Sequence, residues 1–352
     1  MGKSTLFNAL TKTKGALAQN YPFCTIDPNI GIVEVPDHRL KELAEVSKSA
    51  KVIPAAIEFV DIAGLVKGAS EGQGLGNKFL SHIRECDAIA HVVRFFDDPN
   101  VIHVHGKIDP KMDREIIESE LILADLQTLD KRVSKAASDM KSGDKDKKRY
   151  YELLAGIKEK LEKGELASNM ELTKDEKEET RDLHLITMKP HIYTINLTEK
   201  EIVNFDKKVC AEKLGINDPS KIIPICAKIE EDLFGFTDEE RAEYLKSLGI
   251  EETGLDALIK TAYATLGLIT YFTSGITETR AWTVKKGSTA PQAAGVIHTD
   301  FEKGFVKAEV IDWKDFVECK GEVKAKEKGL LRIEGKEYIV RDGDTMHFRF
   351  TS

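Results

Sequence analysis

The stretch Gly2-Lys3-Ser4-Thr5-Leu6-Phe7-Asn8-Ala9-Leu10 decides the fold that we expect for this chain. It matches the second half of the phosphate-binding loop GxxxxGK[ST], which runs into a helix. In that loop, backbone N–H groups and the helix amino terminus hold phosphate oxygens, the lysine reaches the β- and γ-phosphates, and the serine hydroxyl binds Mg²⁺. Half a motif is weak evidence alone, but it makes Gly2, Lys3, Ser4 and Thr5 the candidate phosphate-binding residues.

Two further motifs follow in the order that a P-loop nucleoside triphosphatase requires. Asp61-Ile62-Ala63-Gly64 ends an apolar run that predicts a buried strand, where the Asp holds Mg²⁺ through water and the Gly amide meets the γ-phosphate. Thr25 lies between the two motifs, as a switch threonine that closes over Mg²⁺ should. We therefore expect Ser4, Thr25 and Asp61 to be the Mg²⁺ ligands, and Lys3 and Gly64 to act on the γ-phosphate. An ordinary strand-end turn is the alternative for Asp61–Gly64 taken alone.

The candidate base-recognition element departs from the GTPase pattern. A predicted strand ends in Asn196-Leu197-Thr198-Glu199, where guanine-specific enzymes carry Asn-Lys-x-Asp, and Cys226-Ala227-Lys228 follows the next predicted strand. Because the guanine-reading aspartate is replaced by the longer Glu199, we expect guanine selectivity to be lost and adenine to be accepted. The candidate base-site residues are Asn196, Leu197, Glu199, Ala227 and Lys228. Two ordinary strand ends are the alternative.

Apolar runs at residues 57–62, 88–93, 191–196 and 221–226 alternate with helical segments, which predicts a mostly parallel sheet with covering helices. Residues 126–140 and 150–161 carry apolar side chains at heptad spacing on either side of a polar turn at 142–147, which predicts an antiparallel coiled-coil hairpin. Thr173 and Glu176 have capping-box spacing and predict a further short helix. After residue 268 the short runs 282–284, 305–310, 331–333, 337–340 and 347–350 predict a small sheet-rich domain.

We expect an α/β fold class: a P-loop GTPase-like domain at residues 1–112 and 186–268, an inserted helical coiled coil at 113–185 and a separate domain at 269–352. The net charge of −8 argues against a protein that coats nucleic acid by bulk electrostatics, so no DNA partner is expected. Five widely spaced cysteines favour neither a disulfide framework nor a CxxC metal site. Since no apolar run approaches the roughly 18 residues of a membrane span, we expect a cytoplasmic protein with no membrane partner.

These motifs resemble the Obg-like ATPase family, also called YchF, over nearly the whole chain. The stretches that carry the resemblance are Tyr21–Pro28, Asp61–Ala69, Gly74–Asn77, Asn196–Glu199, Ala290–Gly295 and Thr299–Phe305. The resemblance implies a GTPase-fold domain that prefers ATP, an inserted coiled coil and a carboxy-terminal TGS domain with a β-grasp-like sheet. It also implies association with the ribosome, chiefly its large subunit, and with RNA through the coiled coil and TGS domain, in translation or the stress response.

The sequence differs from the family at its start. Family members carry a preceding segment with the first strand and the Gly-x-Pro-Asn-Val half of the phosphate loop, whereas this sequence starts at Met1-Gly2-Lys3. That strand would be central in the sheet, so we expect its neighbours to lack a partner and several phosphate-facing amides to be missing. A misplaced start codon or a truncated form would explain the difference, and we expect the sequence as given to bind nucleotide poorly.

The residue that would orient the attacking water is not at its usual position after DxxG. Ras-like enzymes use a Gln directly after DxxG, but Leu65 stands there and cannot form a hydrogen bond through its side chain. The family resemblance points to His103 as the replacement, with His105 as the weaker candidate and a solvent-facing loop histidine as the alternative. Two other functions stay open: an adaptor that has lost catalysis, and a GTP-specific translational switch. Nucleotide titration distinguishes all three.

Overall fold

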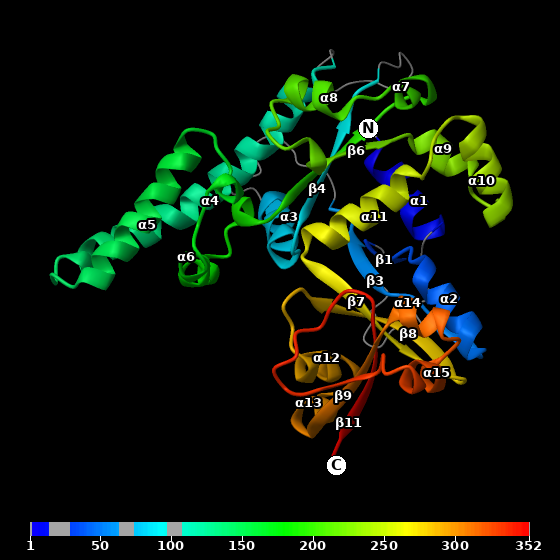
Figure 1. Cartoon of the computed structure of the whole chain (residues 1–352). Helices are drawn as coiled ribbons and strands as arrows, with labels where there is room; N and C mark the ends of the chain where they lie inside the picture. The colour runs from blue at the N-terminus through cyan, green and yellow to red at the C-terminus, as the bar shows by residue number, and fades with distance from the viewer. Residues whose placement is uncertain (1, 14–28, 63–73, 97–107, 352) are drawn as a thin grey trace. The chain divides into compact units, whose positions relative to one another are not determined.

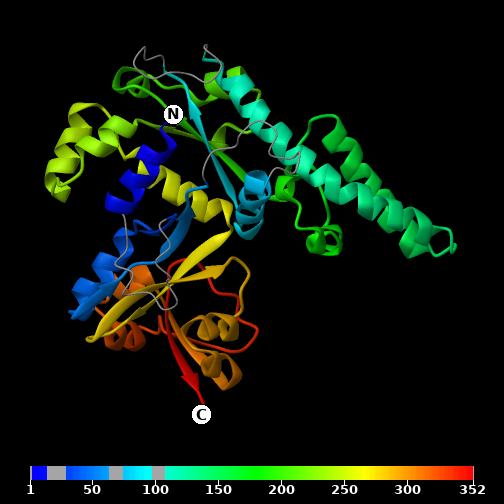
Figure 2. The ribbon, with the colours of Figure 1, turned by 180° about the vertical axis from the view of Figure 1, so that it is seen from behind.

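The computed structural model describes residues 2–13, 29–62, 74–96 and 108–351 (Figures 1 and 2). The chain divides into two compact units. The first comprises Met1–Leu6, Val60–Leu233 and Thr237–Gly254, and the second comprises Phe7–Phe59, Phe234–Phe236 and Leu255–Ser352. Within the described ranges, no helix is both long enough and apolar enough to cross a membrane.

A three-stranded parallel sheet forms the centre of the first unit. Its strands are β4 (Ile89–Arg94), β5 (His191–Asn196) and β6 (Ile222–Ile225), in the order β4-β5-β6. Every residue of β5 is buried, as expected for a central strand whose two faces are both covered. The parallel strands predicted at residues 88–93, 191–196 and 221–226 are confirmed. Helices of this unit are α3 (Gly74–Glu85), α7 (Glu199–Val203), α8 (Lys207–Leu214), α9 (Ala227–Asp232) and α10 (Asp238–Ser247).

The predicted helical hairpin is confirmed as α4 (Pro110–Met140) and α5 (Lys145–Glu162), which run side by side in both views (Figures 1 and 2). Each helix starts at an aspartate whose carboxylate accepts backbone N–H groups, Asp109 for α4 and Asp144 for α5. The buried seam contains Leu129, Ala136, Leu154, Ile157 and Leu161. The short helix α6 (Lys174–Glu179) begins with the predicted capping box.

The second unit contains a six-stranded sheet in the order β10-β9-β11-β7-β8-β2. The strands are β2 (Lys51–Ile53), β7 (Leu268–Ser274), β8 (Glu278–Lys285), β9 (Phe305–Asp312), β10 (Arg332–Glu334) and β11 (Asp344–Phe350). β11 lies parallel to β7 and antiparallel to β9, so the last strand of the chain occupies the middle of the sheet. This is the β-grasp-like order that we expected, with β2 added at one edge. The remaining pair, β1 (Ile30–Glu34) and β3 (Ala56–Val60), forms a separate two-stranded sheet.

Helices flank this sheet. The helices of the unit are α2 (His38–Ser47), α11 (Gly254–Thr265), α12 (Ala290–Ile297), α13 (Thr299–Lys303), α14 (Trp313–Glu318) and α15 (Glu322–Glu327), while α1 (Lys3–Thr13) spans both units. Small alanines of α12 pack with Tyr271, Phe305 and Phe348 in the core of the sheet. Because these alanines have little side chain, the helix approaches the strands closely.

One predicted strand is wrong. Residues 337–340 form a turn with an isolated bridge from Thr289 to Ile339, and the turn is held by Asp344. The Asp344 carboxylate accepts hydrogen bonds from the Tyr338 hydroxyl and the Arg341 N–H, each at 2.8 Å. The alternating pattern Glu-Tyr-Ile-Val predicted a strand from local composition, but the segment makes an isolated bridge to Thr289, and the buried carboxylate of Asp344, a few residues further along the chain, holds the turn.

We expect Gly254→Ala to destabilise the first unit by about 1 to 3 kcal/mol, because overpacking against backbone cannot be relieved by a rotamer change. A Cβ at Gly254 would lie 2.9 Å from the Cα of Ile225 in β6. Gly156, inside α5, has no atom within 4 Å of the same position, so Gly156→Ala should stabilise by up to about 1 kcal/mol. Urea unfolding of both variants tests this contrast, and equal effects would contradict it.

Candidate nucleotide-binding site

The amino terminus of α1 brings Lys3, the candidate phosphate-binding residue, to Asp61 at a strand end. Lys3 is the first residue of the helix, and its ammonium donates a hydrogen bond to the carboxylate of Asp61, which follows β3. The side chain of Lys3 is 41% exposed and that of Asp61 is 18% exposed, so both groups can be reached from solvent. Ser4 and Thr5 lie exposed on the same first turn. Four predicted residues therefore lie within one local cluster.

Asn196 joins this loop to the two strand ends that were predicted to hold the base. It is the last residue of β5 and only 4% exposed, and its Oδ1 accepts a hydrogen bond from the Ala227 N–H at 3.3 Å. A Cβ on Gly2 would lie 2.3 Å from Asn196 Nδ2, and Gly2 has a φ of +136°, a conformation that only glycine adopts readily. The buried amide of Asn196 therefore lies close to Gly2 and also accepts a hydrogen bond from the backbone of Ala227.

Glu199 and Lys228 form an ion pair between the two base-site motifs. Glu199 begins α7, Lys228 lies in the first turn of α9, and the Nζ to Oε1 distance is 2.8 Å. The hydrogen bond to Glu199 raises the pKa of Lys228. Because one carboxylate oxygen already accepts from an ammonium, Glu199 is a poorer acceptor for the two adjacent donors of a guanine edge.

Leu197 is placed differently from its polar neighbours. Its side chain is 3% exposed and belongs to the apolar cluster that contains Cys210 and Leu214 of α8. Its backbone N–H donates to the Ile225 carbonyl at 2.8 Å, which continues the pairing of β5 with β6. Thr25, Gly64 and His103, together with His105, lie outside the described residues.

Sequence reasoning missed two contacts at this site. The bond from Ala227 N–H to Asn196 and the pairing of Lys228 with Glu199 both link segments about 30 residues apart in the chain. The signal was the presence of a polar side chain at the ends of two adjacent parallel strands. Since carboxyl ends of parallel strands meet at one edge of a sheet, such residues face a common crevice.

The ammonium and the carboxylate meet where strands end and a helix begins, so the chain is a P-loop nucleoside triphosphatase of the GTPase fold class. Comparison with known proteins agrees. A family profile described as "50S ribosome-binding GTPase" matches residues 1–133, and the profile YchF-GTPase_C, described as "Protein of unknown function (DUF933)", matches residues 268–351. The chain belongs to the YchF family, as its relatives show.

Those relatives cover almost the whole chain. It is 50% identical over 353 residues to the "Ribosome-binding ATPase YchF" of Bacillus subtilis (strain 168), covering 99% of this chain and 96% of the relative. The protein of the same name from Escherichia coli O157:H7 is 49% identical over 350 residues, with the same coverage. The solved Schizosaccharomyces pombe YchF GTPase superposes with a TM-score of 0.86 at 39% identity, covering 99% of this chain and 95% of that one.

Proposed function

We propose that this chain is an ATPase that hydrolyses ATP in the presence of Mg²⁺ and works on the ribosome. The observation that carries the proposal is the contact between Lys3 and Asp61 at the amino terminus of α1. In this proposal Lys3 would neutralise phosphate charge, and Asp61 beside it would serve the metal ion. The relatives from B. subtilis and E. coli are named ribosome-binding ATPases, which supports both the reaction and the partner.

The donor atoms near α1 suit Mg²⁺. The hydroxyl of Ser4 is exposed on the first turn, and the carboxylate of Asp61 lies against Lys3. Mg²⁺ prefers oxygen ligands and keeps several waters, so a hydroxyl, a carboxylate acting through water and phosphate oxygens form a matching set. Thr25 would add a second hydroxyl. When bound, Mg²⁺ neutralises charge that develops on the phosphates.

We propose that the site prefers ATP over GTP. Guanine selectivity requires a free carboxylate opposite its N1–H and 2-amino groups, and Glu199 is paired with Lys228 at 2.8 Å. Each unpaired buried donor would cost about 1 to 3 kcal/mol. Equilibrium competition between ATP and GTP for a fluorescent nucleotide tests the proposal. Tighter GTP binding would favour a GTP-specific switch, and binding of neither nucleotide would favour an adaptor without catalysis.

We further propose that His103 orients the attacking water, because Leu65 cannot. His103→Ala should lower kcat by about 10- to 100-fold and leave ATP affinity nearly unchanged, as for a positioned group that acts in the transition state. His105→Ala is the matched control and should have a smaller effect. Single-turnover hydrolysis measures both variants, and normal hydrolysis by His103→Ala would remove this residue from the mechanism.

We assign nucleotide binding and ribosome binding to different parts of the chain. Nucleotide binding is assigned to residues 1–112 and 186–268, and contacts with the large ribosomal subunit and its RNA to the coiled coil at 113–185 and a TGS domain at 269–352. In the cytoplasm such a protein would act in translation or the stress response. Co-sedimentation with purified large subunits tests the partner, and absence of the chain from that fraction at low salt with ATP would refute it.

A further inference from the structure

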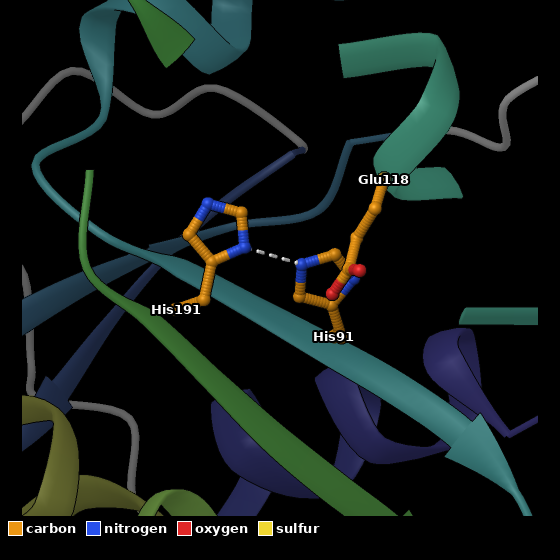
Figure 3. A group of neighbouring side chains, drawn as sticks. All are labelled: His91, Glu118 and His191. Carbon is orange, nitrogen blue, oxygen red and sulfur yellow. Dashed lines mark hydrogen bonds between the residues drawn. The ribbon is translucent and has the colours of Figure 1, made fainter. Parts of the chain in front are cut away.

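Two histidines and a glutamate that belong to neither the phosphate-binding nor the base-recognition motifs meet inside the first unit (Figure 3). His91 lies on β4, His191 begins β5, and Glu118 reaches them from α4. His91 pairs in register with Tyr193 on the neighbouring strand, and His191 lies two residues before Tyr193. The three side chains therefore share one face of the sheet. All three residues are buried: His91 and Glu118 are each 7% exposed, and His191 is 2% exposed. One potential ligand atom from each lies within 4.8 Å of the others.

We propose that His91, His191 and Glu118 form a buried binding site for a first-row transition-metal ion of the Zn²⁺ type. Two imidazole nitrogens and a carboxylate oxygen are the ligands that Zn²⁺ takes in three-residue sites, and imidazole also suits the neighbouring ions Co²⁺ and Ni²⁺. Mg²⁺ prefers oxygen ligands alone, so this site would not compete with Ser4 and Asp61 for it.

The imidazoles are held in the form that binds metals. Burial lowers the pKa of His91 well below its ordinary value, with further lowering from His191 and Arg114. Burial and the positive charge of Lys221 lower the pKa of His191 to about 4. A neutral imidazole carries one N–H and one lone pair, so it can bind a metal through its unprotonated nitrogen at neutral pH.

The ring atoms already face one another. His91 Nε2 and His191 Nδ1 are 2.8 Å apart and share one proton in a hydrogen bond (Figure 3). Two nitrogen ligands of a tetrahedral Zn²⁺ lie about 3.3 Å apart, given Zn–N bonds of about 2.0 to 2.1 Å. Separation by roughly half an ångström would therefore convert the hydrogen bond into a pair of ligands. For both facing nitrogens to bind the ion, the shared proton would have to move to the outer nitrogen of the ring that carries it, or be released to solvent.

The carboxylate is held by its own partners. The Tyr193 hydroxyl donates to Glu118 Oε1 at 2.8 Å, and Arg114 Nη1 lies 3.7 Å from Oε2. Such outer contacts orient a ligand, and removing them commonly changes metal affinity. Tyr193 is neutral and supports binding, whereas the positive charge of Arg114 opposes a divalent cation. Arg114 should therefore weaken the site without abolishing it.

A second group of possible ligands, Glu309, Glu322 and His347, is a poorer candidate. It is largely exposed, and Glu309 lies 3.4 Å from the Lys307 ammonium and accepts a hydrogen bond from Arg349 at 3.0 Å. Two cations therefore already neutralise this carboxylate, and metal binding would have to displace them. His347→Ala serves as a control for this group.

Cobalt titration of the full chain tests the site. The protein is stripped with EDTA and titrated with CoCl₂ without nucleotide or Mg²⁺. We expect intense visible bands of four- or five-coordinate Co²⁺ with nitrogen ligands, saturating at one ion per chain, and their loss on addition of ZnCl₂. A site made of oxygens alone would be six-coordinate and nearly colourless. Failure of the parent chain to develop the bands would overturn the proposal.

Variants locate the ion. Glu118→Gln and His191→Leu should weaken Co²⁺ binding by about 100-fold or more, whereas His184→Asn and His347→Ala, both at exposed positions, should not change it. Arg114→Gln should tighten binding by about tenfold, since it removes a nearby like charge. A gain of affinity cannot result from unfolding, so this variant tests the site even where a ligand variant folds poorly. Bands that persist in Glu118→Gln and do not respond to Arg114→Gln would contradict the assignment.

Discussion

Replacing Lys3 with alanine is expected to lower the rate of ATP hydrolysis by about 10²- to 10³-fold, the usual cost of removing one preorganised charge from a phosphoryl-transfer site. The ammonium of Lys3 lies at the amino terminus of α1 and touches the carboxylate of Asp61. During hydrolysis, negative charge shifts toward the oxygens of the γ-phosphate and the leaving group. A cation already fixed at the helix terminus would stabilise that charge without reorganisation, and alanine could not.

The expected loss is catalytic and not structural. The Lys3–Asp61 pair is partly exposed, and such pairs contribute at most about 1 kcal/mol to folding. The melting temperature of Lys3→Ala should therefore stay close to that of the parent. Lys174 also opens a helix, α6, and is exposed, so Lys174→Ala is the matched control and should hydrolyse ATP normally. Steady-state phosphate release measures both. Parent-like activity of Lys3→Ala would show that Lys3 does not act on the phosphates.

The sheet strands around the site could be predicted because they carry a strong local signal. β5 contains Ile192, Tyr193 and Ile195 in a short run that is buried at every position, and its predicted bounds match those observed. The same holds for the coiled coil, where heptad spacing alone predicts the seam between α4 and α5. In each case, burial repeats with the period of the element, so a short window of sequence contains the information.

Contacts between distant segments could not be predicted in the same way. The sequence predicted that Asn196 belongs to the base site. It did not predict that the Asn196 side-chain oxygen accepts a hydrogen bond from the Ala227 N–H, or that Glu199 pairs with Lys228. Both contacts depend on the exact order and spacing of strands in three dimensions. The addition of β2 to the sheet of the second unit is a further example, since Lys51–Ile53 pairs with Glu278–Arg280. Three residues, of which two are exposed and Ile53 is buried, give too weak a pattern to predict such pairing.

Buried polar groups are the hardest to interpret from sequence. His91 and His191 stand within apolar strand runs, where a histidine looks like a substitution in a core position. Only the fold shows that they meet, and that Glu118 from α4 reaches them. The same is true of Asp125, an acidic residue in a helix whose sequence suggests a solvated position.

Asp125→Ala is expected to have the largest effect on stability, a loss of about 3 to 4 kcal/mol. Asp125 lies in α4 and is fully buried. Its carboxylate accepts three hydrogen bonds: from the Ile186 N–H at 2.9 Å, the Thr187 N–H at 2.7 Å and the Thr187 hydroxyl at 2.6 Å. Each buried donor left without an acceptor costs about 1 to 3 kcal/mol, partly recovered by water or local movement. These donors lie just before β5, so their loss also loosens the strand that ends in Asn196.

Comparison with Asp125→Asn separates the role of the acceptor atoms from that of the charge. Burial raises the pKa of Asp125, and the hydrogen bonds from Thr187 and Ile186 offset this only in part. The charge itself is therefore unfavourable in the fold, and the residue stabilises the protein through the donors that it satisfies. Asparagine keeps one acceptor oxygen but turns an amide group toward a donor, so we expect it to lose about 1 to 2 kcal/mol, less than alanine.

The pH dependence of the protein's stability follows from the raised pKa of Asp125. Because the folded state keeps the proton of Asp125 to a higher pH than the unfolded chain does, the stability that the carboxyl contributes is greatest below about pH 4 and declines as pH rises through the folded pKa. Asparagine at position 125 cannot titrate. The difference in free energy of unfolding between the parent and Asp125→Asn should therefore shrink as pH rises through the folded pKa of Asp125. Urea unfolding at several pH values measures all three proteins. An alanine variant as stable as the parent would show that Ile186 and Thr187 find other acceptors, and a deficit of Asp125→Asn that grows with pH would show that the buried charge is itself stabilising.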